Sequence, residues 1–141
     1  MRKRTLWGVL LLAAISFMLT PQNSQATTLL KAAKLALSPT FKWTTTVVDF
    51  GTITQNSPKT ATFEFTNVGN SPLIISSATG SCGCTVADYT REPVPFNGKG
   101  RVTATYNAAA VGAFNKTVTV TANVPEGTIT LTIKGEVVAA K

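Results

Sequence analysis

Apolar and polar residues alternate with a period of two through most of the second half of the chain. Phe63 and Phe65 alternate with threonine and glutamate, and the same pattern recurs over residues 101–106, 117–122 and 128–134. Because successive side chains of a strand point to opposite faces, each of these segments has one apolar face and one threonine-rich face. The pattern therefore predicts β-strands whose apolar faces need a second layer to cover them.

Turn signals separate these strands. Residues 68–72 (VGNSP) follow the Phe63 strand, residues 97–100 (NGKG) precede the strand over 101–106, and residues 124–127 (VPEG) lie between the last two strands. Glycine, proline and asparagine supply the backbone angles that tight turns need. We interpret residues 124–127 as the loop of a β-hairpin.

Two more strands complete the predicted fold. One covers Leu73–Ile75, and an earlier one runs from Trp43 to Val48 and ends near residues 49–51. About seven short strands, with a turn every ten residues or so, predict an all-β, immunoglobulin-like β-sandwich. About a hundred residues suffice for one such core, so we expect a single domain over residues 41–141. The aromatic residues expected in this core are Trp43, Phe50, Phe63, Phe65 and Tyr106.

The first 26 residues have the order of a secretory signal peptide. Three basic residues at positions 2–4 precede an apolar run over 6–19, and small residues at Ser24 and Ala26 precede the expected cleavage site. The alternative is a retained membrane anchor, but a spanning helix needs about 20 apolar residues and this run is shorter. We therefore expect an exported protein, periplasmic or extracellular, with no transmembrane segment after leader cleavage.

The segment between leader and domain, residues 27–40, has a composition of its own. Leucine, alanine and lysine residues that favour helix fill it, and Pro39 would end a helix there. The apolar residues are spaced only loosely on one face. The sequence is equally consistent with a short N-terminal helix and with a linker.

Charge and composition exclude several classes of partner and of active site. The chain has 13 basic and 6 acidic residues, a net charge of +7, which falls to +4 when the leader is removed. The remaining basic residues are scattered, so a nucleic-acid partner is not expected. There is no histidine, which removes the commonest general base and the commonest metal ligand. We expect no catalytic residue, no bound cofactor and no enzymatic activity outside the two cysteines.

Cys82 and Cys84, the only cysteines, are separated by Gly83. On an extended strand their Cα atoms would lie about 6.6 Å apart with parallel side chains, whereas a disulfide needs Cβ atoms about 3.8 Å apart. A bond therefore requires a turn or bulge, and Gly83 is the residue expected to bend. Closing a three-residue loop stabilises the fold by only about 1.5 kcal/mol.

Other states of the cysteine pair stay open. A weakly stabilising bridge is easily reduced, which is the property of disulfides that take part in thiol–disulfide exchange. Two reduced thiolates suit Cu(I), a soft ion of low coordination number. The thiols could also be buried and inert, like small apolar side chains. Asp88 is the nearest carboxylate in sequence and Arg91 the nearest cation.

Residues 49–138 contain a series of short motifs. They are 49–51 (DFG), 63–67 (FEFTN), 69–75 (GNSPLII), 81–85 (SCGCT), Gly112, Lys116 and 133–135 (IKG). This series resembles that of domain-of-unknown-function family fifteen-seventy-three, small secreted bacterial domains akin to the immunoglobulin-like domains of hydin and major sperm protein type. The SCGCT motif is specific in its position, whereas the strand patterns are not. One departure is at residues 95–98 (PFNG), where the family usually has a Pro-Gly turn, so we expect that loop to differ in shape.

The resemblance implies a fold and an envelope location but no activity. Our leading hypothesis is an exported, non-catalytic domain that binds a protein or another envelope component, for which an exposed edge strand would serve. The competing hypothesis is thiol–disulfide exchange or Cu(I) binding through Cys82 and Cys84.

Overall fold

The computed structural model describes residues 29, 30, 32 and 37–141. The predicted leader, 1–26, and most of the segment expected to be a helix or linker lie outside the described residues, although Leu29, Leu30 and Ala32 have helical backbone. In the described part, no helix is long and apolar enough to cross a bilayer. The eight strands are β1 (Phe41–Trp43), β2 (Val47–Thr54), β3 (Lys59–Asn67), β4 (Ile75–Gly80), β5 (Thr85–Tyr89), β6 (Lys99–Tyr106), β7 (Gly112–Ala122) and β8 (Thr128–Val138).

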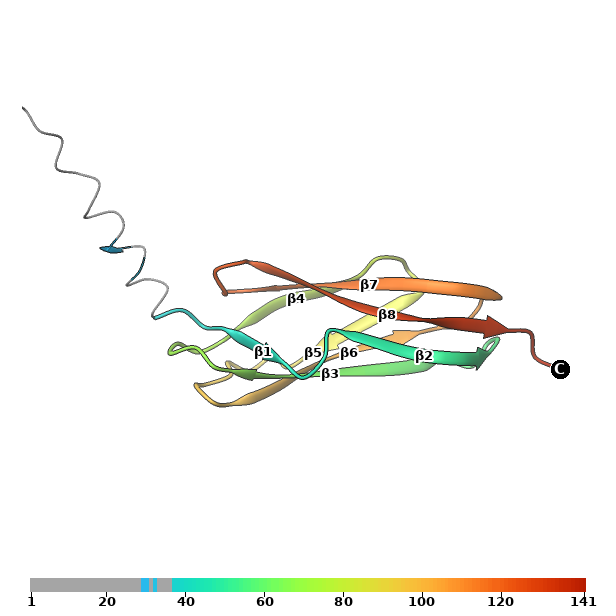
Figure 1. Ribbon diagram of the computed structural model, residues 1–141, viewed down its shortest axis with the longest axis horizontal. Coiled ribbons are helices and arrows are strands. Elements are labelled where there is room, and N and C mark those ends of the chain that lie inside the picture. The colour runs from blue at the N-terminus through green and yellow to red at the C-terminus, as the bar shows by residue number, and fades with distance from the viewer. Residues whose placement is uncertain (1–28, 31, 33–36) are drawn as a thin grey trace, which may run out of the picture.

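The strands form two four-stranded sheets that face each other (Figure 1). The first sheet has the order β1-β3-β6-β5, and the second has the order β2-β8-β7-β4. Neighbouring strands are antiparallel except β2, which runs parallel to β8. This arrangement confirms the predicted all-β, immunoglobulin-like sandwich.

The core lies between the two sheets and consists of the apolar faces that the alternation predicted. Phe63 and Phe65 from β3 are fully buried against Leu131 and Ile133 from β8. Their threonine neighbours point outward, where β-branched side chains suit a half-exposed strand. Of the other aromatic residues expected in the core, Tyr106 is buried. Trp43 and Phe50 are only partly buried and pack against the core from its margin.

The expectation of one strand from Trp43 to Val48 is wrong. β1 ends at Trp43 and belongs to the first sheet, whereas β2 begins at Val47 and belongs to the second. The chain crosses between the sheets in the three threonines between them, which adds an eighth strand. The strand also does not end near Gly51: Gly51 has a φ of 61°, and the register of β2 against β8 shifts there before the strand continues. The glycine therefore marks a β-bulge.

The strand expected over Leu73–Ile75 lies largely elsewhere. Leu73 forms an isolated bridge with Val94, and β4 begins only at Ile75 and extends to Gly80. β5 was not predicted as a separate strand. Its residues invert the usual pattern, since Thr85 is buried and Val86 is exposed.

The turn predicted over residues 97–100 lies two residues earlier, over 95–98, because β6 already begins at Lys99. Residues 124–127 close the β7–β8 hairpin, where Gly127 has a φ of 73°. In residues 95–98 the amide of Gly98 donates to the carbonyl of Pro95 at 2.8 Å, and Asn97 has a φ of 60°. A type II turn needs a positive φ at its third residue, and asparagine tolerates that angle almost as well as glycine.

Candidate functional site

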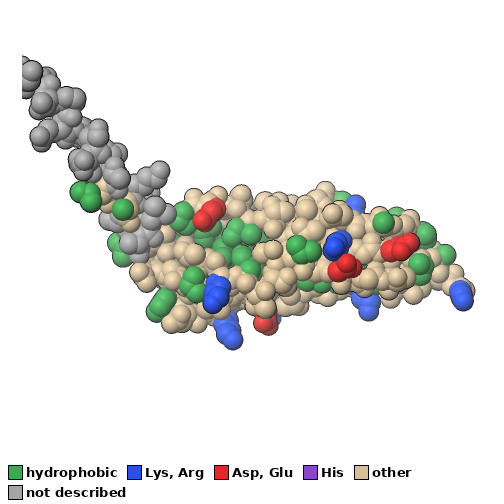
Figure 2. Space-filling view, viewed as in Figure 1, with side chains coloured by type: hydrophobic (Ala, Val, Ile, Leu, Met, Phe, Trp, Pro, Cys, Tyr) green, Lys and Arg blue, Asp and Glu red, His purple; other side chains and the backbone are tan. Residues whose placement is uncertain are grey.

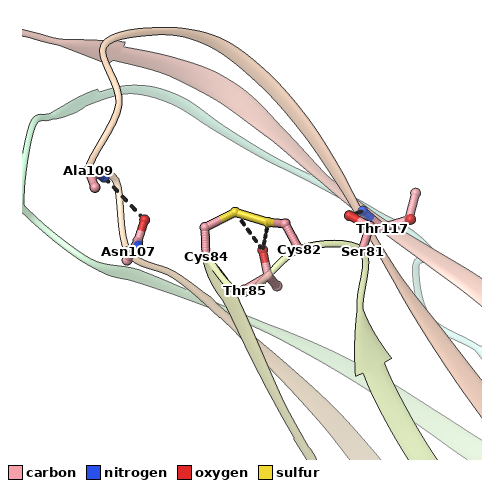
Figure 3. Close-up of a disulfide and its surroundings, with 7 residues drawn as sticks. All are labelled: Ser81, Cys82, Cys84, Thr85, Asn107, Ala109 and Thr117. Atoms are coloured by element: carbon pink, nitrogen blue, oxygen red, sulfur yellow. Dashed lines mark hydrogen bonds between the residues drawn. A yellow bond between two sulfur atoms is a disulfide. The ribbon is translucent and has the colours of Figure 1, made fainter.

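Cys82 and Cys84 form a disulfide in the turn that joins β4 to β5, with Cα atoms 5.2 Å apart (Figure 3). The amide of Thr85 donates to the carbonyl of Cys82 at 3.2 Å, which closes the turn. The Cα separation is shorter than the 6.6 Å or so of a straight strand, as a bridge of this kind requires. The sequence prediction that a bond demands a bend here therefore agrees with the geometry.

Gly83 lies in this turn, as predicted, but its position does not itself require a glycine. A Cβ added at Gly83 would meet no atom within 4 Å, and the φ of Gly83 is not positive. A Cβ at Gly80 would instead overlap the carbonyl oxygen of Thr85, because the end of β4 lies directly against the start of β5. The close approach of these two strands, rather than the bend itself, sets the steric demand for glycine.

The disulfide turn is fixed on both sides. The amide of Asn107 donates to the carbonyl of Cys84 at 3.0 Å, which attaches the turn to the end of β6. The amide of Ser81 donates to the carbonyl of Thr117 at 2.8 Å, and the hydroxyl of Ser81 accepts from the amide of Thr117 at 3.2 Å, which attaches it to β7. The bridge thus lies between the two sheets and is not on a free loop.

One hydroxyl lies beside both sulfurs. Thr85 is buried, and its Oγ1 is 3.7 Å from Sγ of Cys82 and 4.0 Å from Sγ of Cys84 (Figure 3). Cys84 also packs against the hydrophobic core. The hydroxyl is the polar group placed to donate to a sulfur if the bond is opened, because thiolates accept such hydrogen bonds.

The charged residues nearest in sequence do not join this site. Asp88 and Arg91 form an exposed ion pair at 3.1 Å at the far end of β5, where Arg91 also lies over the ring of Tyr89. Among the residues that the structure describes, no group of three histidine, cysteine or acidic side chains is placed to hold a metal ion.

The sheet edges are the second candidate site, because an edge strand presents backbone donors and acceptors that can pair with another chain. Side chains cover the first part of the edge of β2. The hydroxyl of Thr45 donates to the carbonyl of Val47 at 2.8 Å and lies 3.3 Å from its amide. The carboxylate of Asp49 accepts from the amide of Gly51 at 2.8 Å, beside the bulge.

The edges of β4 and β5 block each other. The hydroxyl of Tyr89 donates to the carbonyl of Ser76 at 2.9 Å, which joins the two strands across the gap between the sheets. The carboxylate of Asp88 accepts from the amide of Tyr89 at 2.9 Å. The disulfide turn connects the same two strands at their other end. Little room remains for an added strand on this side.

The edge of β3 is different, because β1 covers only part of it. β1 pairs with residues 65–67 of β3 and then leaves for the other sheet. The amide of Thr44 donates to the carbonyl of Glu64, whereas the amide of Asn67 donates to the carbonyl of Gly98 near β6. Even-numbered residues of β3 therefore direct their backbone groups toward β1, and odd-numbered residues toward β6.

This alternation leaves Thr60 and Thr62 facing outward beyond the end of β1. No other strand of the described part pairs with them on that side, and both side chains are exposed. We call the backbone of residues 59–63 on this side the β3 edge. The alternating pattern placed Thr62 on a polar face, but only the point where β1 ends shows that the edge is open.

The two facing sheets define an immunoglobulin-like β-sandwich, in which β1 belongs to one sheet and β2 to the other. Within that class, residues 41–137 match the family described as "Protein of unknown function (DUF1573)", and the chain belongs to this family. The family assignment agrees with the resemblance carried by the SCGCT motif. No curated protein matches the chain in sequence.

Solved structures show the same fold at low sequence identity. A protein of unknown function from Porphyromonas gingivalis W83 is 19% identical with a TM-score of 0.63, and the match covers 72% of this chain but only 48% of that one. The ASH / PapD-like domain 7 of human CEP192 is 12% identical with a TM-score of 0.56, covering 74% and 89%. The secreted serine protease VesC from Vibrio cholerae is 12% identical with a TM-score of 0.53, covering 79% and 25%. This chain thus spans about half of the P. gingivalis protein.

Proposed function

We propose that this protein is a non-catalytic binding module that takes up an extended segment of a partner polypeptide along the β3 edge. The observation that carries the proposal is the pair of outward-facing backbone units at Thr60 and Thr62, on an edge without the blocking contacts of β2, β4 and β5. Two amides and two carbonyls spaced along one strand match another extended backbone.

The magnitude of this interaction indicates a partner with further contacts. Four backbone hydrogen bonds, at about 1 kcal/mol net each, contribute about 4 kcal/mol, which the entropy cost of association, about 4 kcal/mol or more, offsets. Side chains of the added strand would lie beside exposed Thr60 and Thr62 on the outer face, where cross-strand pairs add about 0.2–1 kcal/mol each. Affinity beyond that level would come from a larger contact surface.

Capture from envelope extract tests the proposal. The double variant Thr60→Pro, Thr62→Pro removes both outward amides and leaves the odd-numbered residues paired with β6. Thr52→Pro is the control for a proline on an edge strand, because Thr52 is exposed on β2, an edge strand of the other sheet. We expect one protein to be retained by the native chain and the control and lost with the double variant. Equal capture by all three chains, or by none, would contradict the proposal.

We also propose that the module acts outside the cytoplasm. The motivation is the order of charge and hydropathy in residues 1–26 together with the disulfide, since disulfides persist in oxidising compartments. Intact-mass measurement on the protein recovered from the envelope fraction tests this directly. The expected mass corresponds to a chain that begins at Thr27 and lacks two hydrogens at the cysteines. A full-length mass in the cytoplasmic fraction would oppose it.

Thiol–disulfide exchange is a second candidate, favoured by the buried hydroxyl of Thr85 beside both sulfurs. A thiolate of a dithiol partner would attack Sγ of Cys82, and Cys84 would leave as a thiolate. The second partner thiolate would then displace Cys82, so that the partner ends as a disulfide and this chain as a dithiol. A redox titration decides between the roles: a potential near about −200 mV fits exchange, whereas one below about −300 mV marks a structural bridge. Cu(I) uptake by the reduced protein, measured by mass, would instead support metal binding.

A further inference from the structure

In the facing sheet, β2 runs along the β3 edge (Figure 1). The amide of Thr44 donates to the carbonyl of Glu64 in β3 at 3.0 Å. Two residues later, the carbonyl of Thr46 accepts from the amide of Thr132 in β8 at 2.8 Å, so the chain crosses between the sheets level with Glu64. From there β2 extends to the turn over residues 54–57, which leads into the start of β3. β2 therefore accompanies the β3 edge along its whole length.

Apolar side chains of β2 line the gap between the sheets on this side. Val48 pairs with Ile133, which is fully buried, so the Val48 side chain points inward. Phe50 also packs against the core, with its ring centroid 6.2 Å from that of Phe114. Both side chains are only partly buried, whereas Val47 points outward and is 48% exposed. Figure 2, in the same view as Figure 1, shows hydrophobic side chains that reach the surface between the two sheets, mainly toward β1. We call Val48 and Phe50 the β2 seam.

In the described part of the chain, the first sheet has no strand opposite the β2 seam. β1 ends at Trp43, level with Phe65, so β3 is the outermost strand of that sheet over residues 59–63. Where β1 is present, its inward side chains cover the core: the rings of Phe41 and Trp43 stack 4.8 Å apart, and both contact the ring of Phe65. β1 thus shows what a strand at this position contributes, namely large apolar side chains at every second residue.

We propose that the segment bound at the β3 edge is an amphipathic strand whose inward side chains are apolar. This inference rests on the proposed function and adds the sequence pattern of the partner. Apolar residues of the partner lie opposite Ala61 and its odd-numbered neighbours, and polar residues lie opposite exposed Thr60 and Thr62. The inward side chains cover the β2 seam as those of β1 cover the core beside it. Their burial supplies the favourable free energy that four backbone hydrogen bonds, offset by the entropy of association, do not.

A second copy of this chain fits the site less well than another polypeptide. If two β3 edges paired around Ala61, each strand would keep its inward side chains in its own core, where Ala61 is 3% exposed and Phe63 is fully buried. Neither side chain could cover the β2 seam of the other copy. We therefore assign the site to a strand whose apolar side chains are not already buried in a domain of its own.

Two synthetic peptides of one composition test the pattern. In the first, valine alternates with threonine, and in the second the same valines are grouped at one end; both carry terminal lysines for solubility. NMR titration follows the amide signals of Thr60 and Thr62 for the β3 edge and the methyl signals of Val48 for the β2 seam. We expect the alternating peptide to shift all of these signals and the grouped peptide to bind at least about fivefold more weakly.

Matched valine substitutions in β2 separate the seam from the edge. Val48→Thr keeps the shape and the strand preference of the side chain but makes the seam polar, and we expect it to weaken binding of the alternating peptide about tenfold. Val47→Thr is the control, because Val47 points outward from the same strand, and it should bind as the native chain does. The double variant Thr60→Pro, Thr62→Pro should bind neither peptide.

The outcomes distinguish this inference from the proposed function. Equal binding of the two peptides, or equal weakening by the two valine substitutions, would overturn the inference, whereas shifts at Thr60 and Thr62 would still support the β3 edge as a binding site. An alternating peptide that shifts neither amide would also overturn it, and capture from envelope extract would then decide the proposed function separately. Shifts at Thr60 and Thr62 on concentrating the native chain alone would assign the edge to a second copy instead.

Discussion

Removing the Asn67 side chain should destabilise the domain far more than a typical polar substitution. In Asn67→Ala, the buried amide of Gly69 and the partly buried amide of Thr40 lose the oxygen that accepts from them. The partly buried carbonyl of Ser71 loses its donor. Val94 is affected less, because its carbonyl still accepts from Leu73 at 2.8 Å. A buried group left unpaired costs about 1–3 kcal/mol. One such group and two partly buried ones give a loss of about 3 kcal/mol.

That loss is a large fraction of the 5–15 kcal/mol or so by which small domains are stable. For a domain of this size, about 3 kcal/mol corresponds to a fall in Tm of roughly 12–24 °C. Urea unfolding followed by circular dichroism gives the free energy, with the slope checked for unchanged two-state behaviour. Asn115→Ala is the control, because Asn115 is exposed on β7, and its expected effect is within about 0.5 kcal/mol. A loss below about 1 kcal/mol for Asn67→Ala would show that the Asn67 hydrogen bonds contribute little to stability.

Four further variants test the packing of the domain by thermal or urea unfolding. Gly80→Ala should lose about 2 kcal/mol or more because its Cβ overlaps a carbonyl, whereas Gly83→Ala should stay within about 0.5 kcal/mol; the reverse order would refute the assignment of the glycine role. Trp43→Phe should change stability by less than about 1 kcal/mol, since the buried indole N–H has no hydrogen-bond partner among the described residues; a loss above about 2 kcal/mol would show that it has one. Replacing Cys82 and Cys84 together by serine should cost about 1.5 kcal/mol, and a loss above about 3 kcal/mol would mean that the bridge is a major staple.

The alternation of side chains predicted much of the fold because it reports burial directly. Where one face of a strand packs on the core, as in β3, β7 and β8, apolar residues recur at every second position. The sequence pattern did not predict β5, because the burial of its residues is inverted: Thr85 is buried beside the disulfide, and Val86 faces solvent. A pattern that follows hydrophobicity alone cannot detect such a strand.

The crossing between β1 and β2 had no local signal. Thr44, Thr45 and Thr46 favour strand as much as their neighbours do, so the sequence reads as one strand where the structure has two. The openness of the β3 edge follows from this crossing and depends on contacts distant in sequence. For the cysteine pair, the spacing predicted that a bond requires a bend but left open whether the thiols are bonded, and the structure was needed to show the disulfide. The Thr85 hydroxyl and the role of Gly80 required the fold.

Amide hydrogen exchange along β3 of the free protein tests the availability of the β3 edge most directly. Ala61 and Phe63 are odd-numbered and pair with β6, whereas Thr60 and Thr62 face outward. We expect slow exchange at Ala61 and Phe63 and exchange faster by orders of magnitude at Thr60 and Thr62. Four amides that exchange equally slowly would show that the β3 edge is already covered and not open to a partner strand.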